Sequence, residues 1–173
     1  MKIALVVGHS KTSSGAYNEK LDITEYSLNE IEAKKVSGLL DDRGVENVVI
    51  YRQKYKDLPV KINKEGADIV LCFHHNSFDE HSTGTETLYY HKSKDGKVFA
   101  EIMQKNIVET LGFKDRGIKP KASEDRGGYV LKYTDAPCLI LEPCFMSNTK
   151  ELQKFMDNLN KYCEAVARAI ESL

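Results

Sequence analysis

The residues most able to do chemistry stand where apolar runs of this sequence end. The stretch VLCFHHNS, Val70–Ser77, contains two adjacent histidines after its apolar part, IALVVGH ends at His9, and PCLILE ends at Glu142. Imidazole and carboxylate groups are common ligands of zinc, and a carboxylate can also accept and donate protons during hydrolysis. These run ends therefore predict a metal or acid–base site, provided that the fold brings them together.

A parallel sheet would bring these residues together. Parallel strands share one carboxyl edge, and ligands of open α/β sheets bind in the crevice outside that edge. We therefore expect His9, His74 and Glu142 to face one cleft. Successive residues of a strand point to opposite sides, so only one histidine of the pair can reach that cleft. We expect His75 to lie behind the site or at the surface.

Glu25 offers a second carboxylate to the same cleft. It stands at the start of a helical pattern that follows the first polar segment, and that segment begins beside His9. A lone glutamate at this position would complement the helix dipole. Together with His9 and His74, it completes the two imidazoles and one carboxylate found in catalytic zinc sites, which leave a fourth position for water.

Glu142 is the candidate general base. It ends a run that should be a central strand, and Pro143 follows it. A buried carboxylate is costly unless it is paired or functional. Burial would raise its pKa and a nearby zinc ion would lower it, so the net direction does not follow from sequence. In either case Glu142 is suited to take a proton from a zinc-bound water.

The elements that would position these residues alternate between strand and helix patterns. We predict strands at Lys2–Val7, Asn47–Tyr51, Asp68–Phe73, Thr85–Tyr90, Gly128–Tyr133 and Cys138–Glu142. We predict helices at Glu25–Arg43, Asp57–Glu65, Lys97–Leu111 and Thr149–Leu173, the last capped by Asn148 or Ser147, and long polar loops at 10–24, 78–84 and 114–127. This alternation predicts one α/β domain with a mostly parallel, twisted sheet of about six strands and helices on both faces.

Composition narrows the function. The 173 residues suit one domain, and the net charge of −1 offers no basic surface for nucleic acid or a polybasic membrane patch. No apolar run reaches the roughly 20 residues of a membrane span, and the apolar N-terminal run is too short for a signal peptide. The four cysteines form no CxxC pair, so we expect buried, reduced thiols at Cys72, Cys138, Cys144 and Cys163.

Taken in order, these motifs resemble the amidase-3 family of zinc-dependent N-acetylmuramoyl-L-alanine amidases, especially the catalytic domains of clostridial phage endolysins. VVGHS is similar to the Gly-His that ends the family's first strand, TEYSLN to its Glu-x-x-x-Asn, and FHHN to its His-x-Asn. GTETLYY and the closing GGYVLKYTDAPCLILEPCFMSN follow in the family's order. The resemblance covers nearly the whole chain and implies one catalytic domain over residues 1–173, without a separate wall-binding domain.

The resemblance also implies roles for particular residues. The implied zinc ligands are His9, Glu25 and His74, with Asn29 as a companion of Glu25, the implied substrate contacts are Asn76 and Glu86, and the implied catalytic acid–base is Glu142. Two departures lie beside these positions. Ser10 replaces a glycine found in many members, and Pro143-Cys144 stands where many members have a residue followed by glycine. Both could reshape the cleft and so alter substrate preference.

The resemblance further implies an activity and a setting. The expected reaction is hydrolysis of the amide between N-acetylmuramic acid and L-alanine, in peptidoglycan of a Gram-positive, clostridial wall. We expect a monomer that binds neither nucleic acid nor membrane. Because no signal peptide is visible, we expect a phage or prophage lysin that is made in the host cytoplasm and acts on the wall after release.

Three alternatives remain open from the residues. Cys72 could act as a nucleophile with His74, because residues two apart in a strand share a face. A zinc peptidase on a similar fold would use the same ligands. The third alternative is a wall-binding or regulatory module that keeps the fold without activity.

Overall fold

The computed structural model describes residues 1–172, which form eight strands, six α-helices and one short 3-10 turn. The strands are β1 (Lys2–Val7), β2 (Tyr17–Asn18), β3 (Ile23–Thr24), β4 (Glu46–Tyr51), β5 (Ile69–Phe73), β6 (Thr85–Tyr90), β7 (Asp115–Lys121) and β8 (Cys138–Glu142). The helices are α1 (Glu25–Asp42), α2 (Leu58–Asn63), α3 (Lys94–Leu111), α4 (Gly128–Tyr133), α5 (Thr149–Asp157) and α6 (Leu159–Glu171), with the 3-10 turn η1 at Tyr55–Asp57.

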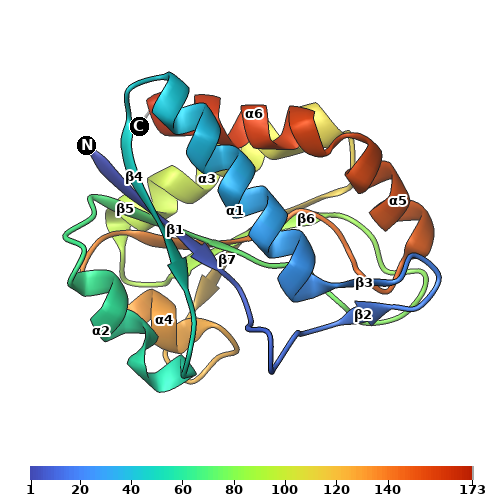
Figure 1. The fold of residues 1–173 in the computed structure, drawn as a ribbon, viewed down its shortest axis with the longest axis horizontal. Coiled ribbons are helices and arrows are strands. Elements are labelled where there is room, and N and C mark those ends of the chain that lie inside the picture. The colour runs from blue at the N-terminus through green and yellow to red at the C-terminus, as the bar shows by residue number, and fades with distance from the viewer. Residues whose placement is uncertain (173) are drawn as a thin grey trace.

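Six of the strands form one sheet in the order β4-β1-β5-β8-β6-β7. In Figure 1 this sheet lies between the helices α1, α3 and α6 above it and α2 and α4 below it. The neighbours from β4 to β8 are parallel, β6 runs antiparallel to β8, and β7 is parallel to β6. The carboxyl ends of β1, β5 and β8 therefore lie at one edge of the sheet, where β6 begins. The predicted α/β class, with a mostly parallel six-stranded sheet, is confirmed.

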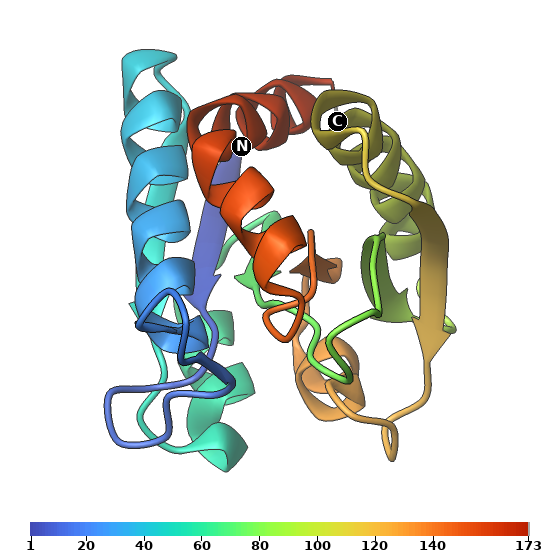
Figure 2. The same ribbon diagram turned by 90° about the vertical axis from the view of Figure 1, so that its right-hand side faces the viewer.

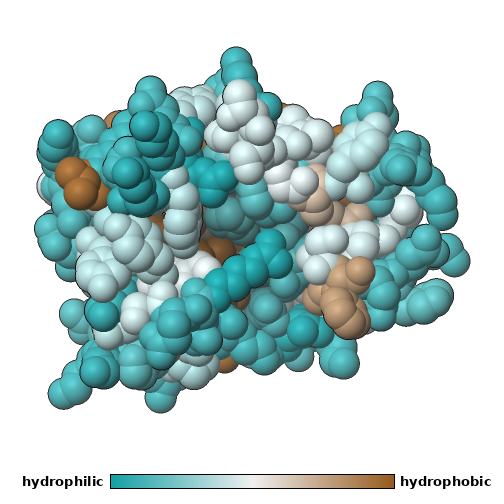
Figure 3. All heavy atoms as spheres, turned by 90° about the horizontal axis from the view of Figure 1, so that it is seen from below, coloured by the Kyte–Doolittle hydropathy of each residue, from teal (hydrophilic) through white to brown (hydrophobic). Residues whose placement is uncertain are grey.

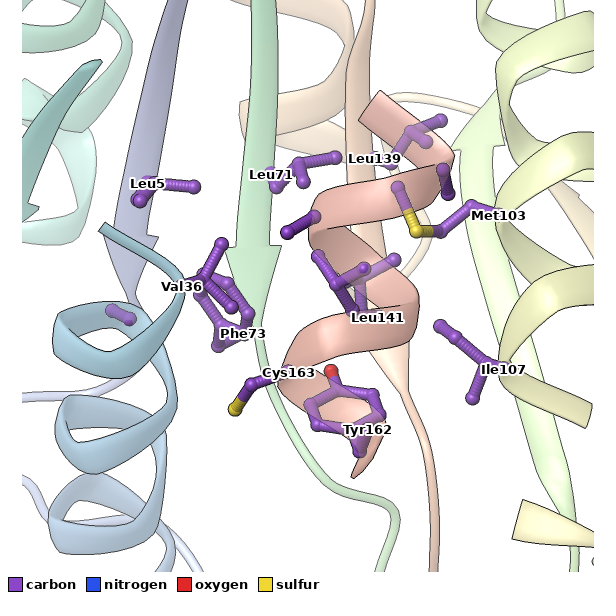
Figure 4. Close-up of a cluster of buried hydrophobic side chains, with 14 of the residues drawn as sticks. Leu5, Val36, Leu71, Phe73, Met103, Ile107, Leu139, Leu141, Tyr162 and Cys163 are labelled. Carbon is purple, nitrogen blue, oxygen red and sulfur yellow. The ribbon is translucent and has the colours of Figure 1, made fainter. Parts of the chain in front are cut away.

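Helices cover both faces of this sheet, as Figure 2 shows, with α1, α3, α5 and α6 on one side and α2 and α4 on the other. Alternate strand residues divide between the two faces because the side-chain period of a strand is two. Leu5, Leu71, Phe73, Leu139 and Leu141 point toward α6 and its neighbours (Figure 4). This face holds the larger hydrophobic core. The four helices on this side therefore pack behind the carboxyl ends of β1, β5 and β8.

The opposite face has a thinner cover. Val6, Cys72 and Ile140 on the strands pack with Leu58 of α2 and Val130 of α4. Both helices are only six residues long. Part of this face is therefore left for a cleft. No α-helix among the described residues has the length and apolar character that crossing a membrane would need.

The predicted strand at Gly128–Tyr133 is wrong, because this segment is helix α4. Its aromatic and β-branched residues favour a strand locally, but a short apolar run fits a buried helix equally well. Gly127, with a φ of 82°, turns the chain into the helix. Val130 and Leu131 then bury themselves against the sheet, so packing decided the outcome.

The predicted loop at 114–127 is also wrong in part, because it contains β7. The strand sequence DRGIKPK holds a glycine and a proline, which hide the strand pattern. Proline is tolerated here because β7 is the edge of the sheet.

The helix predicted at 149–173 is interrupted. It forms α5 and α6, which meet at Asn158, and the predicted end at Leu173 lies outside the described residues. Asn148 caps α5 by accepting a hydrogen bond from the Glu151 backbone N–H, so that expected cap is confirmed. The apolar stripe continues across the break, which is why periodicity alone showed one helix.

Candidate metal centre and active site

The three strand ends do meet at one cleft. His9 follows β1, His74 follows β5 and Glu142 closes β8, and all three line a cavity of about 400 Å³. Figure 3, which looks from the side of α2 and α4, shows a hollow with hydrophobic atoms at its bottom and mostly hydrophilic residues around it. The polar end of this cavity is the shared strand edge.

Glu25 joins the two histidines as expected. Its Oε1 lies 3.0 Å from His74 Nδ1, and its Oε2 lies 3.1 Å from His9 Nε2. One ligand atom from each residue falls within a cluster 4.8 Å across. Only 1% of the Glu25 side chain is exposed, against 16% for His9 and 22% for His74. The carboxylate thus closes the cluster from behind while the imidazoles face the cleft.

The local backbone is shaped to deliver these groups. His9 has a φ of 66°, a conformation rare for residues other than glycine, and this turns its ring away from the strand direction. Gly8 allows β1 to approach β5, because a Cβ there would stand 2.2 Å from the Phe73 carbonyl oxygen. Asn29 holds this turn by donating from Nδ2 to the Gly8 carbonyl oxygen at 3.2 Å.

Electrostatics favour an ionised Glu25. Burial would raise its pKa, but hydrogen bonds from His74 and His9 outweigh burial and hold the pKa well below its usual value. Burial lowers the pKa of His74, although Glu25 opposes that shift. A carboxylate and a neutral imidazole are the protonation states that bind metal.

The cluster fits a zinc ion on its own geometry. Ligands at about 2.0–2.1 Å from a tetrahedral zinc lie about 3.3 Å from one another, close to the 3.0 and 3.1 Å that separate Glu25 from the histidines. His9 Nε2 is also buried, and although Glu25 Oε2 lies 3.1 Å away, the two are not aligned for a regular hydrogen bond. Two imidazoles and a carboxylate can therefore hold a metal and leave its open side toward the cleft.

Glu142 lies beside this cluster with its Oε2 buried and without a hydrogen-bond partner among residues 1–172. Burial raises the pKa of its carboxyl well above the usual value, and the charge of Glu25 adds to that rise. The positive charge of Arg126 opposes it, as does that of Lys121 to a smaller extent. A poorly solvated carboxyl group of this kind can hold and release a proton near neutral pH.

His75 turns away from the cleft, as alternation predicts, and lies in a buried polar cluster. Its Nε2 is 2.6 Å from Oε1 of Glu32 on α1, and both side chains are 0% exposed. Its Nδ1 lies 3.3 Å from the Cys144 sulfur, and its backbone N–H donates to Glu25 Oε1 at 3.1 Å. Burial raises the pKa of Glu32, against the attraction of His75. His75 thus connects Glu25 to the interior.

The two expected substrate contacts also reach the cavity. The Asn76 side-chain nitrogen is buried and has no hydrogen-bond partner among the described residues, so a donor is free to meet a ligand. Glu86 is held by Arg116, whose Nε donates to its Oε2 at 2.7 Å. Arg116 in turn lies 5.0 Å from the centre of the Phe145 ring. Glu86 is therefore a fixed part of the wall.

Sequence reasoning missed several residues around this site. Glu32 stands seven residues after Glu25 on the buried face of α1, so a glutamate inside an apolar stripe was an available signal. Gly15 packs on the cluster, since a Cβ there would stand 2.5 Å from Glu25 Oε2. Arg52 and Arg126 line the cavity, and no periodic pattern marked them because both lie in connections.

The cysteines are buried and free, as expected. A hydrogen bond between Cys72 and Cys138, whose sulfurs are 3.8 Å apart, together with burial raises the Cys72 thiol pKa well above its usual value. Burial likewise raises the pKa of Cys144. A nucleophilic cysteine needs a lowered pKa, so this environment disfavours the cysteine–histidine alternative.

Several known proteins are similar to this chain in sequence and in fold. The chain is 31% identical over 170 residues to the N-acetylmuramoyl-L-alanine amidase LytC of Bacillus subtilis, a match that covers 94% of this chain and 32% of LytC. The chain thus spans about a third of that relative. The catalytic domain of CwlV, an N-acetylmuramoyl-L-alanine amidase from Bacillus (Paenibacillus) polymyxa var. colistinus, superposes with a TM-score of 0.87 at 27% identity, covering 99% of this chain and 96% of that domain.

The catalytic domain of the CD27L endolysin, which targets Clostridia difficile, has the same fold, with a TM-score of 0.85 at 22% identity over 99% of this chain and 97% of that one. Residues 3–172 match the family described as N-acetylmuramoyl-L-alanine amidase. With the three strand ends and the Glu25 helix in their expected places, the chain belongs to the amidase-3 family.

Proposed function

We propose that this chain is a zinc-dependent N-acetylmuramoyl-L-alanine amidase that hydrolyses the amide between the lactyl group of N-acetylmuramic acid and L-alanine in peptidoglycan. The observation that carries the proposal is the cluster of His9, Glu25 and His74, which opens to a cleft beside Glu142. The names of LytC and CwlV, which are relatives of this chain, support the substrate.

His9, Glu25 and His74 would hold the zinc ion. Bound zinc supplies a Lewis acid that lowers the pKa of water from 15.7 to about 7 and polarises a carbonyl. Glu142 accepts the proton of the attacking water. The water oxygen bonds to the lactyl carbonyl carbon, the carbon–nitrogen bond breaks, and Glu142 returns the proton to the departing amine of L-alanine.

Asn76 and Glu86 would position the substrate. Asn76 lines the cavity, and its Nδ2, which has no hydrogen-bond partner among the described residues, is available to donate to a carbonyl oxygen of the substrate. Glu86, fixed by Arg116, offers an acceptor on the neighbouring strand. A fixed acceptor selects a donor such as an amide N–H or a sugar hydroxyl.

The wall type and biological setting are part of the proposal. The Bacillus origin of LytC and CwlV supports a Gram-positive wall. A clostridial host, a phage or prophage lysin made in the host cytoplasm, and a monomeric catalytic domain stay predictions. The domain assignment over residues 1–173 is proposed on the family match, which covers 3–172.

The test combines zinc content with wall hydrolysis for wild type and two matched variants. Glu142→Gln removes the base, and Glu109→Gln makes the same change on the exposed surface of α3. We expect wild type and both variants to bind about one zinc ion per chain. Wild type and Glu109→Gln should release muramic acid from peptide and expose L-alanine amino groups, while Glu142→Gln should be slower by about 100-fold or more.

Four results would contradict the proposal. A wild type that binds no zinc would show that the proposed metal centre does not exist. A Glu142→Gln variant that stays active would show that Glu142 is not the base. If wild type binds purified walls but exposes no amino groups, the chain is a wall-binding or regulatory module. If it cleaves peptide bonds within the stem and leaves the muramoyl amide intact, it is a zinc peptidase.

A further inference from the structure

Three cationic side chains line the cavity without forming an ion pair within 4 Å among the described residues. Arg52, Lys121 and Arg126 all border the space that holds Glu142 and His74. Among residues 1–172 none of the three has an ion-pair partner, whereas Arg43 and Arg116 pair with glutamates at 2.6 and 2.7 Å. Unpaired cations beside a catalytic cleft are available to a negatively charged ligand.

These cations stand on two different walls. Arg52 follows the edge strand β4, and its guanidinium lies 5.6 Å from the centre of the Tyr55 ring. Lys121 ends β7, and Arg126 lies in the connection from β7 to α4. β4 and β7 are the two edge strands of the sheet, so positively charged side chains from both sides of the sheet line the cavity.

The acidic residues of the same walls have partners of their own. Glu86 pairs with Arg116, and Asp125 accepts a hydrogen bond from the Ala122 backbone N–H at 2.7 Å. Glu124 accepts from the Ser123 hydroxyl at 2.8 Å. These carboxylates keep their negative charges, but among residues 1–172 none of them lies within ion-pair distance of Arg52, Lys121 or Arg126.

We propose that Arg52, Lys121 and Arg126 form a subsite for a carboxylate of the peptide stem, so that the enzyme prefers stems with a free carboxylate next to the L-alanine over amidated ones. This subsite rests on the proposed amidase function. Guanidinium groups suit it because they bind carboxylates through two parallel hydrogen bonds.

The position of the charges favours the stem over other anions of the wall. The cations border the same 400 Å³ cavity as Glu142, so a substrate whose amide lies at Glu142 also brings its neighbouring groups close to them. A carboxylate one residue beyond L-alanine lies within a few bonds of that amide. The phosphates of a separate wall polymer have no such connection.

The test uses two soluble N-acetylmuramoyl peptides that differ in one group. One carries a free α-carboxylate on the second stem residue, and the other carries the carboxamide there. Both are given to the zinc-loaded wild type and to the triple variant Arg52→Gln, Lys121→Gln, Arg126→Gln. Arg168→Gln and Lys105→Gln serve as controls, because both residues are exposed and lie outside the cavity.

We expect wild type and both controls to prefer the carboxylate substrate by about tenfold in kcat/KM, as a charge-assisted hydrogen bond would give. The preference should appear in KM and weaken as salt is added. The triple variant should show a ratio near one. If it does not fold, which its melting temperature reports, the three single variants should each lower the ratio.

Binding of the released stem peptides, measured by calorimetry, separates the two proposals. Tighter binding of the carboxylate peptide supports the subsite even if neither muramoyl substrate is cleaved, an outcome that overturns only the amidase function. Equal cleavage of both substrates by wild type, or an unchanged ratio in the variants, overturns the subsite. Equally strong competition by a poly(glycerol phosphate) would assign the cations to wall phosphates instead.

Discussion

At the scale of single residues, the site contains buried polar groups, and some of them have no hydrogen-bond partner among the described residues. Glu142 has a buried oxygen without a partner, and its pKa is raised by burial and by Glu25. His75 and Glu32 form a hydrogen-bonded pair with no exposure. A buried carboxyl without a partner lowers stability, whereas removing one member of a buried pair leaves the other member unpaired, so the two cases lead to opposite predictions for substitution.

Replacing Glu142 by Gln should stabilise the metal-free protein at pH 7. A carboxyl whose folded pKa is raised destabilises the fold above its unfolded pKa, because ionisation there is harder in the folded state. Gln carries no such penalty, so the melting temperature should rise by roughly 2–4 °C, the effect of about 1 kcal/mol in a domain of this size. The difference should shrink as the pH falls toward 4, where both states are protonated.

Thermal unfolding in the presence of chelator, at pH 4 and pH 7, measures this effect. Glu109→Gln is the control and should show little change at either pH, since Glu109 is exposed. A Glu142→Gln protein that is less stable than wild type at pH 7 would mean that the carboxyl has a stabilising partner in solution.

Replacing Glu32 by Ala should, in contrast, lower the free energy of unfolding. The change leaves the buried His75 side chain without its 2.6 Å partner, and breaking a buried pair typically costs about 3–5 kcal/mol. Glu30→Ala on the same helix removes a partly exposed contact with Lys34 at 3.0 Å, and such a pair is worth about 0.3–0.5 kcal/mol. Urea unfolding at neutral pH compares the two variants, and equal losses would show that the buried pair does not support the fold.

At the scale of elements, one face of α1 organises the strand ends. Glu25, Asn29 and Glu32 recur at helical spacing and contact His9 and His74, the Gly8 carbonyl and His75 respectively. Thr24 caps the helix by accepting from the Ser27 backbone N–H. The position of α1 against β1 and β5 therefore sets the geometry of the metal cluster.

Two glycine substitutions should separate this geometry from general helix stability. Gly8→Ala would place a Cβ 2.2 Å from the Phe73 carbonyl oxygen and 2.7 Å from His74 Cε1, so β1 and β5 must move apart. We expect a loss of about 1–3 kcal/mol and weaker zinc binding. Gly38→Ala in α1 meets nothing within 4 Å and should stabilise by about 0.5–1 kcal/mol with zinc binding unchanged.

Competition for zinc with a coloured chelator, together with urea unfolding, measures both glycine variants. Zinc affinity that is unchanged in Gly8→Ala would show that the close approach of the strand ends is not required for the cluster.

At the scale of the whole molecule, the metal cluster joins elements that are distant in sequence. His9 follows β1, Glu25 begins α1 and His74 follows β5, so a ligand that binds all three holds these elements together. A ligand that binds only the folded state stabilises it by mass action, by about 2.7 kcal/mol at 100 times its dissociation constant.

Removing zinc should therefore lower the melting temperature. The expected decrease is roughly 5–10 °C, given about 2–4 °C per kcal/mol in a domain of this size. Scanning calorimetry with added zinc and with chelator measures this shift. Glu25→Gln should show almost no zinc-dependent shift, because it loses the carboxylate between the two histidines. A wild type without any shift would contradict the proposed cofactor.

Local patterns in the sequence were enough to predict the sheet class and the convergence of His9, Glu25, His74 and Glu142. Apolar runs mark buried strands, and parallel strands must deliver their final residues to one edge. The alternation of a strand likewise places the side chains of His74 and His75 on opposite sides.

Tertiary structure alone decided the rest. Whether Gly128–Tyr133 became a helix, and whether the glycine- and proline-containing β7 joined the sheet, depended on packing partners far away in the chain. The Glu32–His75 pair and the unpaired cations of the cleft likewise could not be predicted from the sequence pattern. A periodic pattern records which face of an element is buried, but it does not record which side chains from other elements stand opposite that face.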